Sequence, residues 1–209
     1  MVETAPLTAG ASGRRNDMLS DLVRNNRSCR RFHQEYAIDA DTLRELVDLG
    51  RLSASGANLQ PLKYIISSHP DQNEIVFGTL AWAGYLKDWS GPAEGEKPTA
   101  YIIIMADTDV SQDPGCDHGI AAQSILLGAR EKGLAGCLLG TIKRRQLRDG
   151  LGIDELFNIL LVVALGKPKE EVVIDALHGQ GSVKYWRDAE GVHHVPKRLL
   201  ADIIVATFD

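Results

Sequence analysis

The sequence Arg27-Ser28-Cys29-Arg30-Arg31-Phe32 lies between two helical patterns near the start of the chain. It gathers three guanidinium groups and a hydroxyl within six residues and ends on an aromatic side chain that can anchor the segment in a core. A guanidinium is always charged and presents a planar fork of donors that matches phosphate oxygens, which favours a phosphate-binding segment. A basic helix end, whose arginines cap free backbone carbonyls, is the alternative that the segment alone leaves open.

The whole chain has 209 residues, a net charge of -5 and 44% hydrophobic residues, which suits one domain with a sizeable core. The acidic balance argues against a nucleic-acid-binding protein, and no apolar run reaches the length of a membrane span. Residues 1–16 resemble a disordered lead without a signal peptide, which leaves residues 17–209 as a single domain. Cys29, Cys116 and Cys137 form no CxxC pair, which predicts reduced thiols and a cytoplasmic location.

Hydrophobic periodicity and turn residues divide the chain into interleaved helices and strands, with no internal repeat. The spacing predicts helices over residues 18–25, 39–52, 75–86, 118–132 and 144–151. It predicts strands over residues 63–67, 100–106, 134–139, 159–165 and 192–195. Residues 88–98 are expected to form a loop that could act as a lid, and residues 199–205 a helix or an extended arm. This order of elements indicates an α/β or α+β fold.

No glycine-rich phosphate motif is present, so a phosphate site in this chain must be built from side chains. The Arg27–Arg31 segment supplies one basic cluster, and Lys197-Arg198 supplies a second near the far end of the chain. The two clusters either converge on one phosphate or form two unrelated surface patches, and the residues alone leave both possibilities open.

Two further groups of residues invite a metal-binding interpretation. Cys116-Asp117-His118 precedes a long apolar helix, so Asp117 is interpreted as a helix-start carboxylate. His193 and His194 are adjacent in an expected strand and face opposite sides, so they cannot bind one ion together. A surface turn is the preferred interpretation of this histidine pair, and no metal site is predicted.

Four short motifs follow one another at a spacing that indicates a family. They are Arg27-Ser28-x-Arg30-x-Phe32, Ser55-x-x-Asn58-x-Gln60-Pro61, Gly133-Leu134-x-x-Cys137-x-x-Gly140 and Ala164-Leu165-Gly166-Lys167-Pro168. The series resembles the FMN-dependent nitroreductase family over residues 21–205, nearly the whole chain. Two positions depart from the family pattern, because Ala54 stands where proline is usual and Leu62 where an aromatic residue is common.

The resemblance implies an α+β fold, namely a three-layer α/β/α sandwich around a mainly antiparallel central sheet, in an intertwined homodimer with FMN at the subunit interface. It implies an oxidoreductase in which NADH or NADPH gives hydride to flavin N5 and a nitroaromatic, a quinone or a similar acceptor is then reduced by a ping-pong mechanism. The flavin carries the chemistry, so no catalytic side chain is expected. The alternatives are a flavin-dependent dehydrogenase or dehalogenase of a specific metabolite, and a non-catalytic protein that binds or senses FMN.

The resemblance also implies which residues hold the cofactor. Arg27 and Ser28, joined by Lys197 or Arg198, bind the phosphate, and Arg30 lies at the pyrimidine edge of the flavin. The remaining cofactor-binding residues belong to a loop from the partner subunit and to a segment along one face of the ring. They are Ala54, Ser55, Gly56, Asn58 and Gln60 in the loop, and Leu138, Leu139 and Gly140 in the segment.

Overall fold

The computed structural model describes residues 13–208 of the chain. The expected disordered lead lies outside these residues up to residue 12, whereas residues 13–16 form the start of helix α1 (Gly13–Asn25). The other helical elements are α2 (Ala40–Arg51), the 3-10 turn η1 (Gly56–Asn58), α3 (Pro70–Gly78), α4 (Asp117–Glu131), α5 (Arg144–Leu151) and α6 (Leu200–Ile203). Within residues 13–208, no helix combines the length and the apolarity that crossing a membrane requires.

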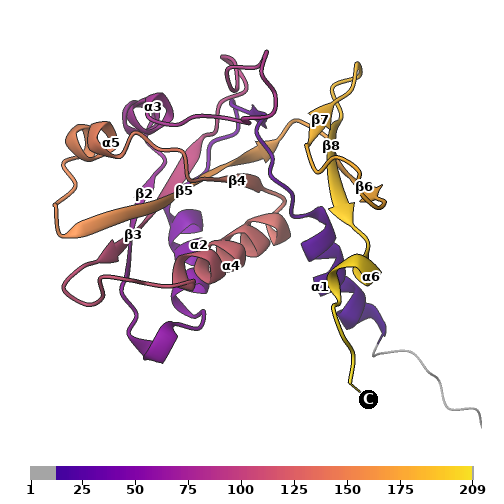
Figure 1. The fold of residues 1–209 in the computed structure, drawn as a ribbon. Helices are drawn as coiled ribbons and strands as arrows, with labels where there is room; N and C mark the ends of the chain where they lie inside the picture. The colour runs from indigo at the N-terminus through magenta and orange to yellow at the C-terminus, as the bar shows by residue number, and fades with distance from the viewer. Residues whose placement is uncertain (1–12, 209) are drawn as a thin grey trace, which may run out of the picture.

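The central sheet is antiparallel at every pairing among the described residues. Its strands are β1 (Phe32–His33), β2 (Leu62–Ser67), β3 (Ala100–Asp107), β4 (Ala135–Leu139) and β5 (Phe157–Pro168). The long strand β5 organises the sheet, because it pairs with β3, with β4 and, at its end, with β1 (Figure 1). The N-terminal Arg cluster therefore enters the sheet directly through Phe32.

Strand β3 separates two apolar cores, as the near-continuous apolar run over residues 100–106 predicts. Ile102 and Ile104 pack on one face with side chains of α2 and α4. Tyr101 and Ile103 pack on the other face with side chains of α3 and α5. Successive residues of a strand point to opposite faces, so one strand serves both cores. The expected three-layer α/β/α sandwich is confirmed (Figure 1).

A second, smaller sheet follows the central one in the chain. It contains β6 (Val172–Leu177), β7 (Trp186–Arg187) and β8 (His193–Arg198), with β8 parallel to β6 and antiparallel to β7. Figure 1 shows this sheet beside the central body, above helices α1 and α6. The expected strands include β8 approximately and omit β6, although β6 begins with the strand-favouring residues Val172, Val173 and Ile174. The two-residue strands β1 and β7 are too short to give a periodic signal.

The expected helix over residues 75–86 is wrong in position. Helix α3 begins instead at Pro70, whose fixed φ suits the first helical position, and the His69 ring accepts the Asp71 N–H at 3.3 Å. After Gly78 the chain runs alongside residues 141–142, where Leu80 forms an isolated bridge with Ile142. Backbone pairing with a distant segment therefore overrides the helical periodicity of residues 79–86.

Gly136 in β4 offers a test of the packing between the sheet and α4. A Cβ at this position would lie 2.6 Å from the Ala164 carbonyl oxygen and 2.7 Å from Leu126 Cδ2. The backbone oxygen cannot move aside, so Gly136→Ala is expected to lower the free energy of unfolding by about 1–3 kcal/mol. Chemical denaturation measures the change.

Gly119→Ala in α4 is the matched control, because a Cβ there would meet nothing within 4 Å. Alanine favours a helix over glycine, so this variant should be neutral or more stable by up to about 1 kcal/mol. Equal stability of the two variants would contradict the close packing of β4.

Candidate functional site

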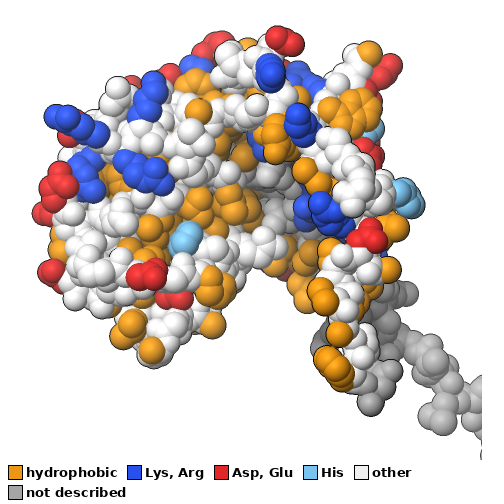
Figure 2. Space-filling view, viewed as in Figure 1, with side chains coloured by type: hydrophobic (Ala, Val, Ile, Leu, Met, Phe, Trp, Pro, Cys, Tyr) orange, Lys and Arg blue, Asp and Glu red, His pale blue; other side chains and the backbone are white. Residues whose placement is uncertain are grey.

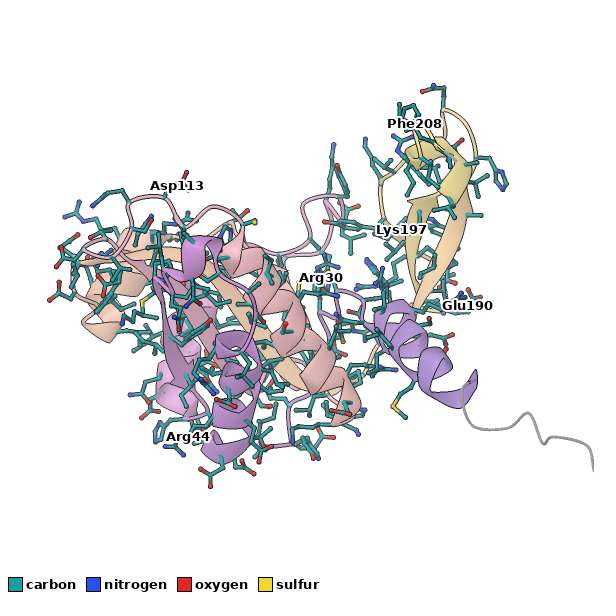
Figure 3. The ribbon with its side chains drawn as sticks, turned by 90° about the horizontal axis from the view of Figure 1, so that it is seen from below. Arg30, Arg44, Asp113, Glu190, Lys197 and Phe208 are labelled. Carbon is teal, nitrogen blue, oxygen red and sulfur yellow. The ribbon has the colours of Figure 1, made fainter. Side chains whose placement is uncertain are left out.

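The two basic clusters meet at one cavity. Its volume is about 300 Å³, and its walls are formed by the segment that follows α1, by α4, β4 and β8, and by Tyr185 before β7. The lining residues are Asn26, Arg27, Ser28, Arg30, Gln123, Leu126, Leu138, Tyr185, His193, Val195 and Lys197. Figure 2 shows a hollow between the central body and the small sheet, and Figure 3 places Arg30 and Lys197 on its two sides. The two basic clusters are therefore not two separate surface patches, because residues of both line this one cavity.

Strand β8 decides which basic residue of the second cluster reaches the cavity. His193, Val195 and Lys197 alternate along β8, and all three line the cavity. Arg198 is the next residue along the strand, so its side chain leaves from the opposite face. The structure therefore brings Lys197, and not Arg198, to the Arg27–Arg30 segment.

The arginines beside this cavity fit an anionic cofactor such as FMN. The Arg30 side chain is buried, with 8% of the residue exposed, yet no carboxylate among the described residues pairs with its guanidinium. Arg27 Nη2 donates to the Val23 carbonyl at 2.7 Å, which caps α1 as the alternative interpretation of the segment predicts. However, the Nε atoms of Arg27 and Arg30 are both buried without a partner among the described side chains, those of residues 18–208. Buried cations and donors without partners are costly, and a bound anion would offset that cost.

Arg31 faces a different partner from its neighbours. Its Nε and Nη2 both lie 2.7 Å from the Glu96 carboxylate, in the two-point geometry that arginine favours. Hydrogen bonding to Arg31, assisted by Lys169, lowers the pKa of Glu96 to about 2. This guanidinium is therefore already paired, which separates Arg31 from the cavity-lining arginines.

His193 is the most deeply buried ionisable group of the cavity wall. The prediction that it lies in a surface turn is therefore wrong. The residue is fully buried, and its Nε2 lies 3.2 Å from Arg30 Nη1. Burial, followed by the charges of Arg30 and Arg187, lowers the pKa of His193 to about 4, so the imidazole is neutral near pH 7. His194 faces the other way as expected, between the carboxylates of Asp175 and Asp188.

Glu170 joins the small sheet to the Arg cluster. Its side chain is fully buried, it accepts the backbone N–H of Arg30, and it pairs with Arg187 Nη2 at 2.8 Å. The Arg187 guanidinium also lies over the Trp89 ring, 4.9 Å from its centroid. The contacts of Glu170 with the Arg30 amide and with Arg187 form a polar seam between the two sheets, and this seam holds β8 beside the cavity. The candidate lid over residues 88–98 is a loop, and its Trp89 contacts this seam and the apolar core.

The loop expected to flank a flavin lies away from this cavity. Ala54, Ser55 and Gln60 line a separate cavity of about 200 Å³, and η1, which contains Gly56 and Asn58, lies at the lower end of the body in Figure 1. One chain therefore presents the two expected halves of the site separately.

Asp117 holds this loop in a strained conformation. Its carboxylate accepts the Ser55 hydroxyl at 2.6 Å and the Gly56 N–H at 2.9 Å, while the Ser55 hydroxyl accepts the Gln60 N–H at 2.9 Å. Three non-glycine residues of the loop, Ala57, Asn58 and Gln60, have φ values of 50°, 55° and 54°. Left-handed backbone of this kind is unfavourable for alanine, so the closed network of hydrogen bonds must stabilise it.

The segment expected to line one flavin face divides between two environments. Leu138 is partly exposed and lines the first cavity, whereas Leu139 points into the apolar core on the other side. Gly140 follows at the end of β4, where its carbonyl accepts from Arg144. Burial raises the pKa of the Cys137 thiol, which supports the interpretation of this residue as an apolar filler.

The chain belongs to the nitroreductase family, whose sequence pattern matches residues 23–89 and 98–167. It is 27% identical over 158 residues to an Archaeoglobus fulgidus protein with the provisional name NADH dehydrogenase/NAD(P)H nitroreductase, covering 72% of this chain and 85% of that protein. The structure resembles a nitroreductase family protein from Clostridium novyi with a TM-score of 0.60 and 23% identity, covering 72% of this chain and 84% of that one. An FMN-dependent nitroreductase from Clostridium difficile gives a TM-score of 0.59 at 18% identity, with 72% and 87% covered. The expected fold is thus confirmed, and the protein is an oxidoreductase.

Sequence reasoning missed three residues that shape the site. Asp117 is indeed in the first turn of α4, but its contacts with the distant loop carry no sequence signal. His193 could have been found, because its spacing of four residues from Lys197 places both on one face of a strand. Tyr185 lies outside any predicted element. No group of three metal-binding side chains occurs among the described residues.

The Ser55 hydroxyl offers a test of the loop network. Ser55→Ala leaves the Gln60 N–H and one Asp117 oxygen without a partner, so the free energy of unfolding should fall by about 1–3 kcal/mol. Ser182→Ala, in an exposed segment without regular secondary structure, should change it by less than about 0.5 kcal/mol. Chemical denaturation of both variants measures the difference, and equal values would contradict the network.

Proposed function

We propose that the protein is an FMN-dependent NAD(P)H oxidoreductase that reduces a nitroaromatic, a quinone or a similar electron-poor acceptor by a ping-pong mechanism. The observation that carries this proposal is the meeting of Arg27, Ser28, Arg30 and Lys197 at one cavity. Three cations and a hydroxyl from the two ends of the chain match a phosphate group with an adjoining electron-rich ring. The names of the relatives, which mention FMN, NADH and NAD(P)H, support the same assignment.

Each residue of the cavity is assigned a separate role in FMN binding. When bound, FMN supplies a ring that takes hydride at N5 and passes it to an acceptor. Arg27, Ser28 and Lys197 hold the phosphate, and Arg30 supplies a fixed positive charge towards the ring. The partly exposed Leu138 offers apolar surface against which a flat ring can pack. A cation beside the pyrimidine edge favours the reduced ring, because negative charge develops there on reduction.

A homodimer would complete the site. The loop residues Ala54, Ser55 and Gln60 lie away from the Arg cluster in one chain, so a second copy is needed to bring the two halves together. Hydrophobic side chains gather on the C-terminal arm in Figure 2 and are largely exposed: Leu200, Ile203, Ile204, Val205 and Phe208. Such an apolar arm favours burial against a second copy of the chain.

Anaerobic reduction tests the proposed activity. The purified protein should show the absorption of bound oxidised flavin, lose its colour with excess NADH or NADPH, and regain it when a quinone is added. Steady-state kinetics should give parallel double-reciprocal lines. Bound flavin that stays oxidised with both nucleotides would instead indicate a protein that binds FMN without turnover.

Neighbouring arginines provide a matched test of the phosphate assignment. Arg27→Ala should weaken FMN binding by about tenfold or more, because it removes a charge-assisted hydrogen bond to phosphate. Arg31→Ala should leave FMN binding nearly unchanged, since Glu96 already occupies this guanidinium. Flavin fluorescence titration measures both dissociation constants, and equal losses would refute the assignment.

Light scattering tests the dimer. The FMN-bound protein should have a mass of twice the 22.8 kDa chain, because the apolar arm and the divided site require a second copy. A monomer that retains FMN would contradict the shared site.

A further inference from the structure

Arg30 is held in place before any cofactor arrives. An arginine side chain has several rotatable bonds, and fixing it on binding costs free energy that a preformed site avoids. In this structure Arg30 Nη1 donates to the Ser28 carbonyl at 3.4 Å, and the guanidinium also contacts His193 and Tyr185. His193 and Tyr185 come from the far end of the chain, so residues in and beside the small sheet help to determine where this cation stands.

The contact with His193 fixes the state of the imidazole. Guanidinium carries donors and no acceptor, so the Arg30 Nη1–H must donate to His193 Nε2 across the 3.2 Å that separates them. Nε2 is then unprotonated, and the proton of the neutral ring lies on Nδ1. Nδ1 is buried and has no partner among the side chains that the structure describes. The low pKa of His193 agrees with this neutral form.

Tyr185 supports both members of the pair. The Arg30 guanidinium lies 4.9 Å from the centroid of the Tyr185 ring, within the range of a cation–π contact. The Tyr185 ring packs on His193 with centroids 5.3 Å apart and on Tyr85 with centroids 4.9 Å apart. The backbone N–H of Tyr85 also points to the Tyr185 hydroxyl at 3.4 Å. Tyr185 is therefore itself anchored from two sides.

We propose that His193 is a positioning residue, which holds the Arg30 guanidinium as a fixed cation at the FMN site by accepting a hydrogen bond from it. This inference rests on the proposed function, because it assumes that the cavity binds FMN. It assigns a role to a residue outside the motifs that define the family resemblance. The effect of His193 on the cofactor passes entirely through Arg30.

A double-mutant cycle on FMN binding tests the proposal. His193→Phe keeps an aromatic ring beside Tyr185 and removes the acceptor, so the FMN dissociation constant should rise about tenfold. His193→Gln restores an acceptor on a side chain of similar reach and should recover most of the affinity. The Arg30→Ala, His193→Phe double variant should bind FMN no more weakly than Arg30→Ala alone. A purely structural role for His193 would not give this dependence on Arg30.

His194→Phe is the matched control, because His194 is the next residue of β8 and faces Asp175 and Asp188 rather than the cavity. It should leave the FMN dissociation constant unchanged, and thermal unfolding should show that all the variants fold. Losses from Arg30→Ala and His193→Phe that multiply in the double variant would overturn the inference while FMN binding by the parent protein stands. A parent protein that binds no FMN would overturn the proposed function together with the inference.

Discussion

The buried carboxylate of Glu170 connects the two parts of this molecule on which its function depends. It accepts a hydrogen bond from the backbone N–H of Arg30 in the central body, and it forms an ion pair with the Arg187 guanidinium in the small sheet. The central sheet obtains its stability from two apolar cores, but nothing in those cores specifies where β8 lies. The polar seam at Glu170 does so, and it places His193 and Lys197 across the cavity from Arg27.

Such a seam has an energetic consequence. Removing water from a carboxylate and a guanidinium is costly, and their attraction recovers this cost only when every remaining donor and acceptor is also paired. Both carboxylate oxygens of Glu170 are paired, one with the Arg30 amide and one with Arg187, whereas Arg187 Nε is buried without a partner among the described side chains. The Arg30 guanidinium does not meet the condition either, since it contacts the Ser28 carbonyl, a neutral imidazole and an aromatic ring, and no carboxylate among the described side chains. The structure thus leaves positive charge unpaired at the position where an anionic cofactor would stabilise it.

Local signals in the sequence predict much of the fold. Helix α2 forms within the range expected over residues 39–52, where the Asp39 carboxylate caps it by accepting the Thr42 N–H, and the buried run of β3 stands out as an apolar strand. The helix expected over residues 75–86 fails because a bridge between Leu80 and Ile142 supplies backbone partners from far along the chain. Long-range pairing of this kind leaves no trace in the periodicity of the segment itself.

The residues of the candidate site also fall into two groups, those predictable from the local sequence and those that depend on long-range contacts. Arg27, Ser28 and Arg30 form a contiguous motif, so the family resemblance finds them directly. Lys197 is found only as one of two adjacent basic residues, and strand geometry is needed to separate it from Arg198. Asp117, which holds the strained loop, acts through contacts with residues about sixty positions away. Only the folded chain shows those contacts.

The central claim is that the cations around this cavity bind the phosphate of FMN, and parallel titrations of the apoprotein with FMN and with riboflavin test it most directly. The two ligands share the same ring and differ in the phosphate. The structure predicts that FMN binds at least about a hundredfold more tightly, because several charge-assisted hydrogen bonds reach the phosphate alone. Equal affinities for FMN and riboflavin would contradict a phosphate site built from Arg27, Ser28 and Lys197.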